Sequence, residues 1–286
     1  CQLFYNQKNE SNQLFNNMPP VRKTVRVQQI FDGKEEIDLR PMGVNLLYFP
    51  KFLDNKDASS IFRALMLSKA FTQHQYINRF KKQITPHRLT HAHVPKDRRY
   101  RFLGQNLNRS ENEIFVQHFD QLVDRLPYTR IKPNSSVSNA YRYNNEDYIA
   151  PHTDDEKFLK SNNSELWTDS TVYTFTLLND NDNPMLYHFA NPKQEGSKID
   201  GFELHARHGS LIIQGSVLHT VLKKSGNGSV GRISITLRTL HSECSCKKSQ
   251  GKCQKITCPV NSGPSNYLYY SNKSALSKPK IKAVFK

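Results

Sequence analysis

The chain has 286 residues, with 41 Lys and Arg against 25 Asp and Glu, so its formal net charge is +16. A positive charge of this size favours a polyanion, above all nucleic acid, as the partner. Hydrophobic residues make up 36% of the chain, and no apolar run approaches the roughly 20 residues that a membrane-spanning helix needs. The first twenty residues lack the apolar stretch of a signal peptide. We therefore expect an intracellular protein with no membrane partner, and a nuclear location is compatible with it.

Two helices are predicted in the first half of the chain. The apolar segment 43–50 ends at a proline and predicts a strand. Asp54 then precedes apolar residues at helical spacing, which predicts a helix over about 55–70. A capping box at 110–113 begins the second helix, which stops at Pro127 because proline cannot continue a helix.

Beyond residue 135 the hydrophobic period changes to two, which is typical of strands. Clusters of Asn, Asp, Gly and Pro separate the alternating segments, as expected of turns. Two helices followed by a series of short strands predict an α+β fold, a jelly roll or double-stranded β-helix with flanking N-terminal helices. The predicted strands cover residues 136–143, 171–178, 185–189, 201–206, 209–214, 217–222 and 231–239.

These patterns divide the chain into three parts. Residues 1–40 are rich in Asn and Gln, and we predict a loosely ordered N-terminal extension there. Residues 41–240 hold both helices and all of the predicted strands, so they form the folded domain. Residues 241–286 contain nine lysines and a single acid, a net charge of +8, and we predict a basic tail.

His152 and Asp154 form a His-x-Asp pair. On an extended backbone, residues i and i+2 point to the same side, so this imidazole and carboxylate can hold one metal ion. A second histidine would complete a 2-His-1-carboxylate triad, which leaves open positions on Fe(II) for a co-substrate and O₂. The pair alone is not diagnostic, because a surface strand with a salt-bridged Asp has the same pattern.

We predict His219 as the third ligand, because it lies between an apolar strand and a strand that carries two arginines. His208 and His241 flank the same region and are the alternatives. Three further histidines in a basic, polar segment could form an unrelated metal pair, although such histidines are more commonly solvated. They are His87, His91 and His93.

In the segment 231–239, polar residues share one face of the predicted strand and apolar residues share the other. The polar face carries Arg232 and Arg238, and arginines facing the inside of a barrel are costly unless they meet anions. A dicarboxylate co-substrate would supply such an anion. A bidentate guanidinium–carboxylate pair would hold its far end. Asn139 and Tyr141 alternate on another strand and would offer hydrogen-bond donors to the same cavity.

Taken in order, these motifs resemble the AlkB family of Fe(II)/2-oxoglutarate-dependent dioxygenases. The resemblance covers roughly residues 42–240 and is specific, because the elements recur in order at plausible spacing. It implies a dioxygenase domain over residues 41–240 that uses Fe(II), 2-oxoglutarate and O₂. The elements that carry it are Asn139-x-Tyr141, His152-x-Asp154, His219 and Arg232-x5-Arg238.

The resemblance implies a role for each matching residue. The catalytic residues, which would bind iron, are His152, Asp154 and His219. The residues that would contact 2-oxoglutarate are Asn139, Tyr141, Arg232, Ser234 and Arg238. Among these, Arg232 would take the distal carboxylate, and Arg238 would lie near the proximal carboxylate and Asp154. Ser234 replaces an Asn that is common in the family.

The resemblance also implies a nucleic-acid substrate. Asp155 and Glu156 directly follow the metal-binding Asp, and they resemble the repair branch of the family, in which acids at this place help to read a flipped base. Tyr100 and Arg101, like the segment 85–88, fall where the family's nucleotide-recognition segments lie. We therefore expect these four residues to bind the substrate.

Four of the five cysteines lie within fifteen residues of the basic tail. Four thiolates would suit one tetrahedral Zn²⁺, with neighbouring lysines offsetting their charge. Their spacing is not that of two C-x2-C pairs, so a reduced, flexible basic tail is the alternative. In either form the tail would add salt-dependent phosphate affinity. These cysteines are Cys244, Cys246, Cys253 and Cys258.

The sequence thus predicts an AlkB-like oxidoreductase that demethylates N-alkylated bases in DNA or RNA, with a role in DNA repair or RNA demethylation. Two alternatives remain. The same iron chemistry could act on a protein side chain or a lipid, or the chain could be a basic nucleic-acid-binding protein with a vestigial iron site. The presence of every expected iron ligand argues against the vestigial site.

Overall fold

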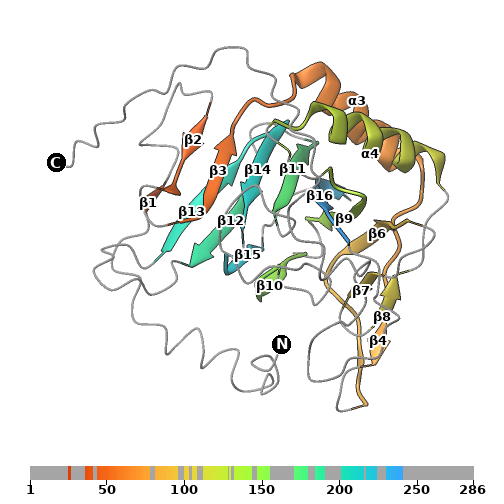
Figure 1. The fold of residues 1–286 in the computed structure, drawn as a ribbon. Helices are drawn as coiled ribbons and strands as arrows, with labels where there is room; N and C mark the ends of the chain where they lie inside the picture. Colours follow the sequence, from red (N-terminus) through yellow and green to blue (C-terminus); the bar gives the residue numbers. More distant parts are fainter. Residues whose placement is uncertain are drawn as a thin grey trace, which may run out of the picture.

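The computed structural model describes residues 25–26, 36–40, 44–77, 81–95, 100–102, 105–107, 112–127, 129, 132–143, 147–154, 171–179, 184–190, 201–215, 217–223 and 230–240. Two mainly antiparallel sheets face each other, and two helices cover the outer face of the larger sheet (Figure 1). The predicted jelly roll with flanking helices is therefore confirmed. No helix in the described part of the chain is long and apolar enough to cross a membrane.

The larger sheet separates the helices from the interior of the jelly roll. Because alternate side chains of a strand point to opposite faces, Ile233, Ile235 and Leu237 pack toward the helices, while Ser234 and Thr236 point into the roll. The strands of this sheet, in order, are β2 (Ile37–Asp38), β3 (Leu46–Phe49), β14 (Ser210–Gln214), β11 (Val172–Leu178), β16 (Val230–Arg238), β9 (Ser135–Arg142) and β6 (Leu89–His93).

The smaller sheet closes the roll from the other side. A second apolar cluster fills the space between the sheets, with Tyr48 and Ile212 from the larger sheet against Phe189 and Phe202 from the smaller one. The strands of the smaller sheet, in order, are β1 (Val25–Arg26), β13 (Gly201–Ala206), β12 (Met185–Ala190), β15 (His219–Val221) and β10 (Ile149–His152). Two short hairpins add β4 (Tyr76–Ile77) with β5 (Gln83–Ile84), and β7 (Tyr100–Phe102) with β8 (Gln105–Leu107).

Both predicted helices are present, with small shifts at their ends. Helix α3 (Asn55–Leu67) is capped by Asp54, as predicted, and ends about three residues earlier than expected. Helix α4 (Glu113–Arg125) is capped by Asn112, whose side chain accepts from the backbone N–H of Phe115. The cap therefore lies two positions beyond the start of the predicted capping box. Asp57 of α3 and Arg125 of α4 form an ion pair that joins the two helices.

Eight strands were not predicted from the sequence, namely β1, β2, β4, β5, β6, β7, β8 and β10. β6 and β10 lie in basic or Pro-containing stretches, where period-two alternation of apolar residues is weak. Residues 36–40, which were expected to belong to the N-terminal extension, include β2; this strand pairs with β3, and Ile37 and Leu39 are buried. Residues before 41 thus belong to the fold: these two apolar side chains complete the core, and β1 pairs with β13 of the smaller sheet.

Candidate metal centre and adjoining cavity

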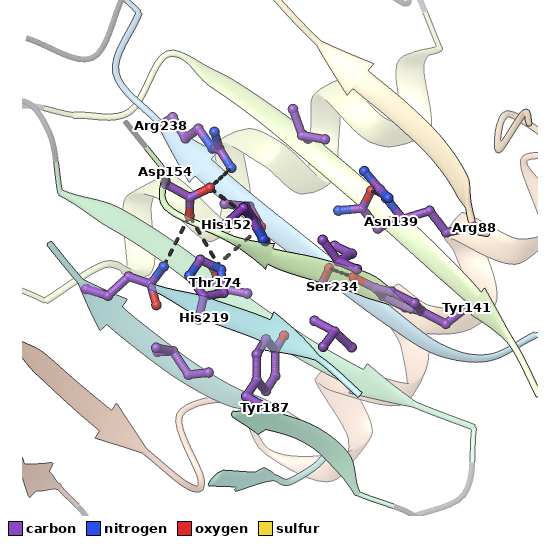
Figure 2. Close-up of a pocket in the computed structure, with 16 residues that line it drawn as sticks. Arg88, Asn139, Tyr141, His152, Asp154, Thr174, Tyr187, His219, Ser234 and Arg238 are labelled. Carbon is purple, nitrogen blue, oxygen red and sulfur yellow. Dashed lines mark hydrogen bonds and ion pairs between the residues drawn. The ribbon is translucent and has the colours of Figure 1, made fainter. Parts of the chain in front are cut away.

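Three side chains converge at one end of the roll. His152 ends β10, Asp154 follows two residues later, and His219 begins β15; the antiparallel pairing of these strands sets His152 opposite His219. The ligand atoms of the three residues all lie within 4.8 Å of one another. Figure 2 shows both imidazoles turned toward the carboxylate, with Nε2–carboxylate distances of 3.7 Å for His152 and 3.8 Å for His219.

Local backbone contacts fix the tautomer of both histidines. Nδ1 of His152 lies 2.9 Å from the carbonyl oxygen of Ala150, and Nδ1 of His219 lies 2.9 Å from that of Val217. Because a carbonyl oxygen can only accept a hydrogen bond, each Nδ1 carries a proton, and in a neutral ring Nε2 is then left with the lone pair. Burial, with the neighbouring His219, lowers the pKa of His152 to about 3, so its imidazole is neutral, as a metal ligand must be.

Asp154 is an ionised carboxylate held at both oxygens. Arg238 donates to Oδ1 at 2.7 Å and Gln214 donates to Oδ2 at 3.1 Å. Burial alone would raise the pKa of Asp154, but Arg238, the two imidazoles and the Gln214 amide together hold it well below its usual range. Two neutral imidazole nitrogens and one carboxylate are the donors of a 2-His-1-carboxylate Fe(II) site, so the residues present fit this metal.

A cavity adjoins the three ligands on the inner face of the larger sheet (Figure 2). The space between the lining side chains, counted together with the open mouth, is about 480 Å³. Its wall is mixed in chemistry, with polar groups from the larger sheet and apolar ones from both sheets. The lining residues are Arg88, Val137, Asn139, Tyr141, Ile149, His152, Asp154, Thr174, Tyr187, Ile212, Gln214, His219, Val221, Ser234, Thr236 and Arg238.

The structure brings four of the five residues predicted to contact 2-oxoglutarate to this wall. Asn139 accepts hydrogen bonds at Oδ1 from Arg88 (2.8 Å) and Thr90 (3.3 Å). The hydroxyls of Tyr141 and Ser234 lie 3.4 Å apart. Burial raises the pKa of Tyr141, so its phenol keeps its proton and remains a donor. Arg238, the fourth, borders the cavity from the metal side.

Arg232, the fifth, lies behind this wall. Its side chain is fully buried, and its guanidinium carbon is 5.2 Å from the ring centroid of Tyr141. It donates to the carbonyl oxygens of Leu222 (3.3 Å) and Asp147 (3.1 Å), and its Nε has no hydrogen-bond partner. The Asp147 carboxylate is paired with Arg142 at 2.9 Å. Within the described residues, Arg232 is therefore a buried cation without an ion pair.

The remaining predicted residues are placed only in part. Tyr100 and Arg101 lie in β7, which pairs with β8, but their side chains lie outside the described ones. Asp155, Glu156 and the four tail cysteines also fall outside the described residues. Their predicted roles therefore stay predictions.

The alternative histidine ligands have other contacts. His208 accepts from the backbone N–H of Leu178 at 2.9 Å and contacts the Ser59 hydroxyl at 3.0 Å, so it joins α3 to the larger sheet. His91 is buried rather than solvated, and its ring stacks on Phe115 with centroids 3.5 Å apart. Among the described residues, the only potential metal-binding group is the triad of 152, 154 and 219. His241 lies outside them.

Gln214 was not predicted as a site residue, and Arg88 was given only an indirect role. Gln214 is 2% exposed and stands at the end of an otherwise apolar strand; a single amide in such a run is a signal that could have been used. Arg88 was placed by resemblance in a nucleotide-recognition segment, and the structure sets it against Asn139 on the cavity wall. That contact depends on β6 pairing with β9, which period-two alternation did not predict.

The chain is similar in structure to two proteins of known structure. One is OsALKBH1, which is 15% identical to this chain in sequence. The match covers 68% of this chain and 98% of that one, and its TM-score is 0.41. The other is an oxidoreductase of the 2OG-Fe(II) oxygenase family from Burkholderia pseudomallei, which is 10% identical in sequence. The match covers 71% of this chain and 89% of that one, and its TM-score is 0.43. No protein-family model and no curated protein matches the chain. At these identities and TM-scores, the chemistry of the chain must be inferred from its own residues.

Proposed function

We propose that the chain is an Fe(II)- and 2-oxoglutarate-dependent dioxygenase that demethylates N-alkylated bases in DNA or RNA. The observation that carries this proposal is the triad of His152, Asp154 and His219, set with tautomers and charge suited to Fe(II) at the end of a cavity. Bound iron with 2-oxoglutarate and O₂ would supply the oxidation that hydroxylates an N-methyl carbon, with succinate and CO₂ as co-products. The resulting hydroxymethyl group then leaves the base as formaldehyde.

The protein's part in this reaction is to hold and orient. Arg238 and Gln214 fix both oxygens of Asp154, so the carboxylate is preorganised before a metal binds. The Nδ1–carbonyl contacts of the two histidines direct their Nε2 atoms to the same point. These contacts come from both sheets, so the jelly roll itself holds the site in place.

The electrostatics of the cavity support a dicarboxylate co-substrate. Arg232 is a buried cation without an ion pair among the described residues, and an unpaired buried charge is strongly unfavourable. Tyr141 and Ser234 lie between it and the cavity and offer hydroxyl donors. A carboxylate beside Tyr141 would lower the cost of the buried guanidinium. We assign the distal carboxylate of 2-oxoglutarate to this end and the proximal one to the iron end near Arg238.

The net charge of +16 supports nucleic acid as the substrate. A base can reach the cavity only if it leaves the stack, and a basic surface would hold the strand while it does so. We assign Asp155, Glu156, Tyr100 and Arg101 to contacts with the nucleic acid, as the AlkB resemblance implies. A nuclear location fits this substrate and is part of the proposal.

The C-terminal segment would strengthen binding without adding sequence preference. Residues 241–286 carry nine lysines, and each lysine that meets a phosphate adds salt-dependent affinity. We propose that its four cysteines bind Zn²⁺. Metal analysis of the chain purified without added zinc would show about one Zn²⁺ per chain; a Cys-free tail variant with the same zinc content would contradict this.

The proposal is tested by incubating the Fe(II)-loaded protein with 2-oxoglutarate, O₂ and a panel of methylated single- and double-stranded DNA and RNA oligonucleotides. Mass spectrometry of the oligonucleotides should show loss of the methyl group from at least one of them. If only a peptide or a lipid supports succinate formation, the iron chemistry stands and the substrate class is wrong. If no substrate supports it, the dioxygenase assignment fails.

A further inference from the structure

Two aromatic rings are stacked in segments that adjoin the cavity-lining residues in the chain. The rings of His87 and Tyr148 have centroids 5.2 Å apart and planes 26° from parallel. The backbone N–H of Tyr148 donates to the carbonyl oxygen of His87 at 3.1 Å, which fixes the two segments together. His87 is exposed and Tyr148 is half-buried. The pair therefore presents aromatic surface to solvent on a backbone that is held in place.

A lysine completes this feature. Nζ of Lys223 lies 5.1 Å from the ring centroid of Tyr148, and the residue is exposed. We call His87, Tyr148 and Lys223 the mouth platform. They come from three separate segments, which precede β6, precede β10 and follow β15. One aromatic pair with one cation is the combination that binds a nucleotide without reading its sequence.

The mouth platform is tied to the cavity by chain connectivity. Its three segments also supply cavity-lining residues, namely Arg88, Ile149 and Val221, each one or two positions from a platform residue. A strand whose target base occupied the cavity would continue past these segments, which carry lining and platform residues close together in the chain. A nucleotide next to the target base would meet these rings first.

The charge of the surrounding sequence favours the same partner. Residues 81–101, which include His87, contain seven Lys and Arg and one acid, Asp97. Such a stretch attracts a phosphate backbone at long range. Stacked rings alone would suit many apolar ligands, but rings with Lys223 beside them, in a basic stretch of the sequence, favour a nucleic acid.

We propose that the mouth platform binds the nucleotide adjacent to the target base of a single-stranded nucleic acid. Its base stacks on the His87–Tyr148 pair and its phosphate faces Lys223. The inference rests on the proposed function for its substrate class, and it adds a binding site outside the cavity. Because every base has a π-face, the site tolerates any flanking sequence.

The test measures binding of the full chain to a fluorescently labelled, unmethylated single-stranded oligonucleotide of mixed sequence, once as DNA and once as RNA. His87→Ala and Tyr148→Leu should each weaken binding about tenfold, whereas Tyr148→Phe, which keeps the ring, should bind as the wild type does. Lys223→Ala should reduce the slope of log affinity against log salt by about one. His118→Ala on α4 and Lys51→Ala are the matched controls and should change neither quantity.

Fe(II) binding and thermal unfolding of each variant are measured in parallel, so that loss of the fold is separated from loss of the platform. If the wild type binds oligonucleotides and His87→Ala and Tyr148→Leu bind equally well, the platform is overturned while the proposed function stands. If the wild type binds neither DNA nor RNA, the proposed substrate class fails and the platform fails with it.

Discussion

At the scale of single residues, Asp154 is the point at which the two sheets meet the candidate iron site. Arg238 and Gln214 hold its carboxylate from the larger sheet, and the two histidine ligands reach it from strands of the smaller sheet. The consequences of changing Asp154 and its partners are therefore different and can be separated by measurement.

Asp154→Ala removes the only anionic ligand of the described triad. We expect Fe(II) binding, measured by anaerobic titration, to fall below detection. The change also leaves Arg238 buried without the carboxylate at 2.7 Å, so the free energy of unfolding should fall by about 3 kcal/mol. The exposed Asp124→Ala on α4 should alter neither quantity. Tight Fe(II) binding by Asp154→Ala would show that the metal site is wrongly placed.

Gln214→Met keeps the volume of the side chain but removes its N–H donor to Asp154. We expect Fe(II) affinity to fall about 10- to 100-fold, because the carboxylate loses one of the two groups that orient it. Gln117→Met, an exposed position on α4, is the control. If Gln214→Met binds Fe(II) as tightly as the wild type, the amide only fills space.

Arg232→Met distinguishes a co-substrate ligand from a structural residue. Replacing an unpaired buried charge by an apolar side chain of similar length is often neutral or stabilising, so thermal unfolding should shift little. The apparent KM for 2-oxoglutarate should rise at least about tenfold, because the distal carboxylate loses its charge partner. A large loss of stability with an unchanged KM would contradict the assigned role.

At the scale of elements, β6 is packed on α4 through a histidine. Burial, with the positive charge of His93 and His74, lowers the pKa of His91 to about 4. In the unfolded chain the imidazole takes up a proton near pH 6.5, but in the native state it does so only near pH 4. The stability associated with neutral His91 is therefore complete above pH 6.5 and is lost as the pH falls toward 4, by on the order of 3 kcal/mol.

His91→Phe preserves a ring against Phe115 and removes this titration. Denaturant unfolding at a series of pH values should show a shallower decline between pH 6.5 and 4 for the variant than for the wild type. His118→Phe, on the same helix as Phe115, is the comparison. Parallel declines in wild type and His91→Phe would mean that His91 is already protonated in the native state.

The elements also show what the sequence could predict. β16 was predicted to within one residue at each end, because Arg232 to Arg238 alternate with apolar residues that pack on the helices. β6 was not predicted, because its interior positions are filled by Thr90, His91 and Ala92, which carry no alternating apolar signal. The candidate metal ligands could be predicted because His152 and Asp154 form a compact motif and His219 lies between an apolar strand and an arginine-bearing one. The contact of Arg88 with Asn139, by contrast, exists only once two distant strands pair.

At the scale of the whole molecule, the basic residues behind the net charge of +16 lie in different places and serve different roles. Half of the charge lies in residues 241–286. Within the rest, Arg88, Arg232 and Arg238 are buried around the cavity, so they are available to a small anion rather than to a phosphate backbone. The nucleic-acid binding that we propose would therefore depend on other basic residues. The segment 81–101 contains seven Lys and Arg, Arg88 among them, with one acid.

The most direct test of the central claim measures succinate and formaldehyde together. The Fe(II)-loaded wild type is supplied with 2-oxoglutarate, O₂ and the methylated oligonucleotide that it modifies best, beside the unmethylated oligonucleotide and the Asp154→Ala variant. The account predicts that the methylated strand releases formaldehyde in step with succinate, and that neither control does so. Formaldehyde release that persists in Asp154→Ala, or succinate formation indifferent to the methyl group, would contradict it.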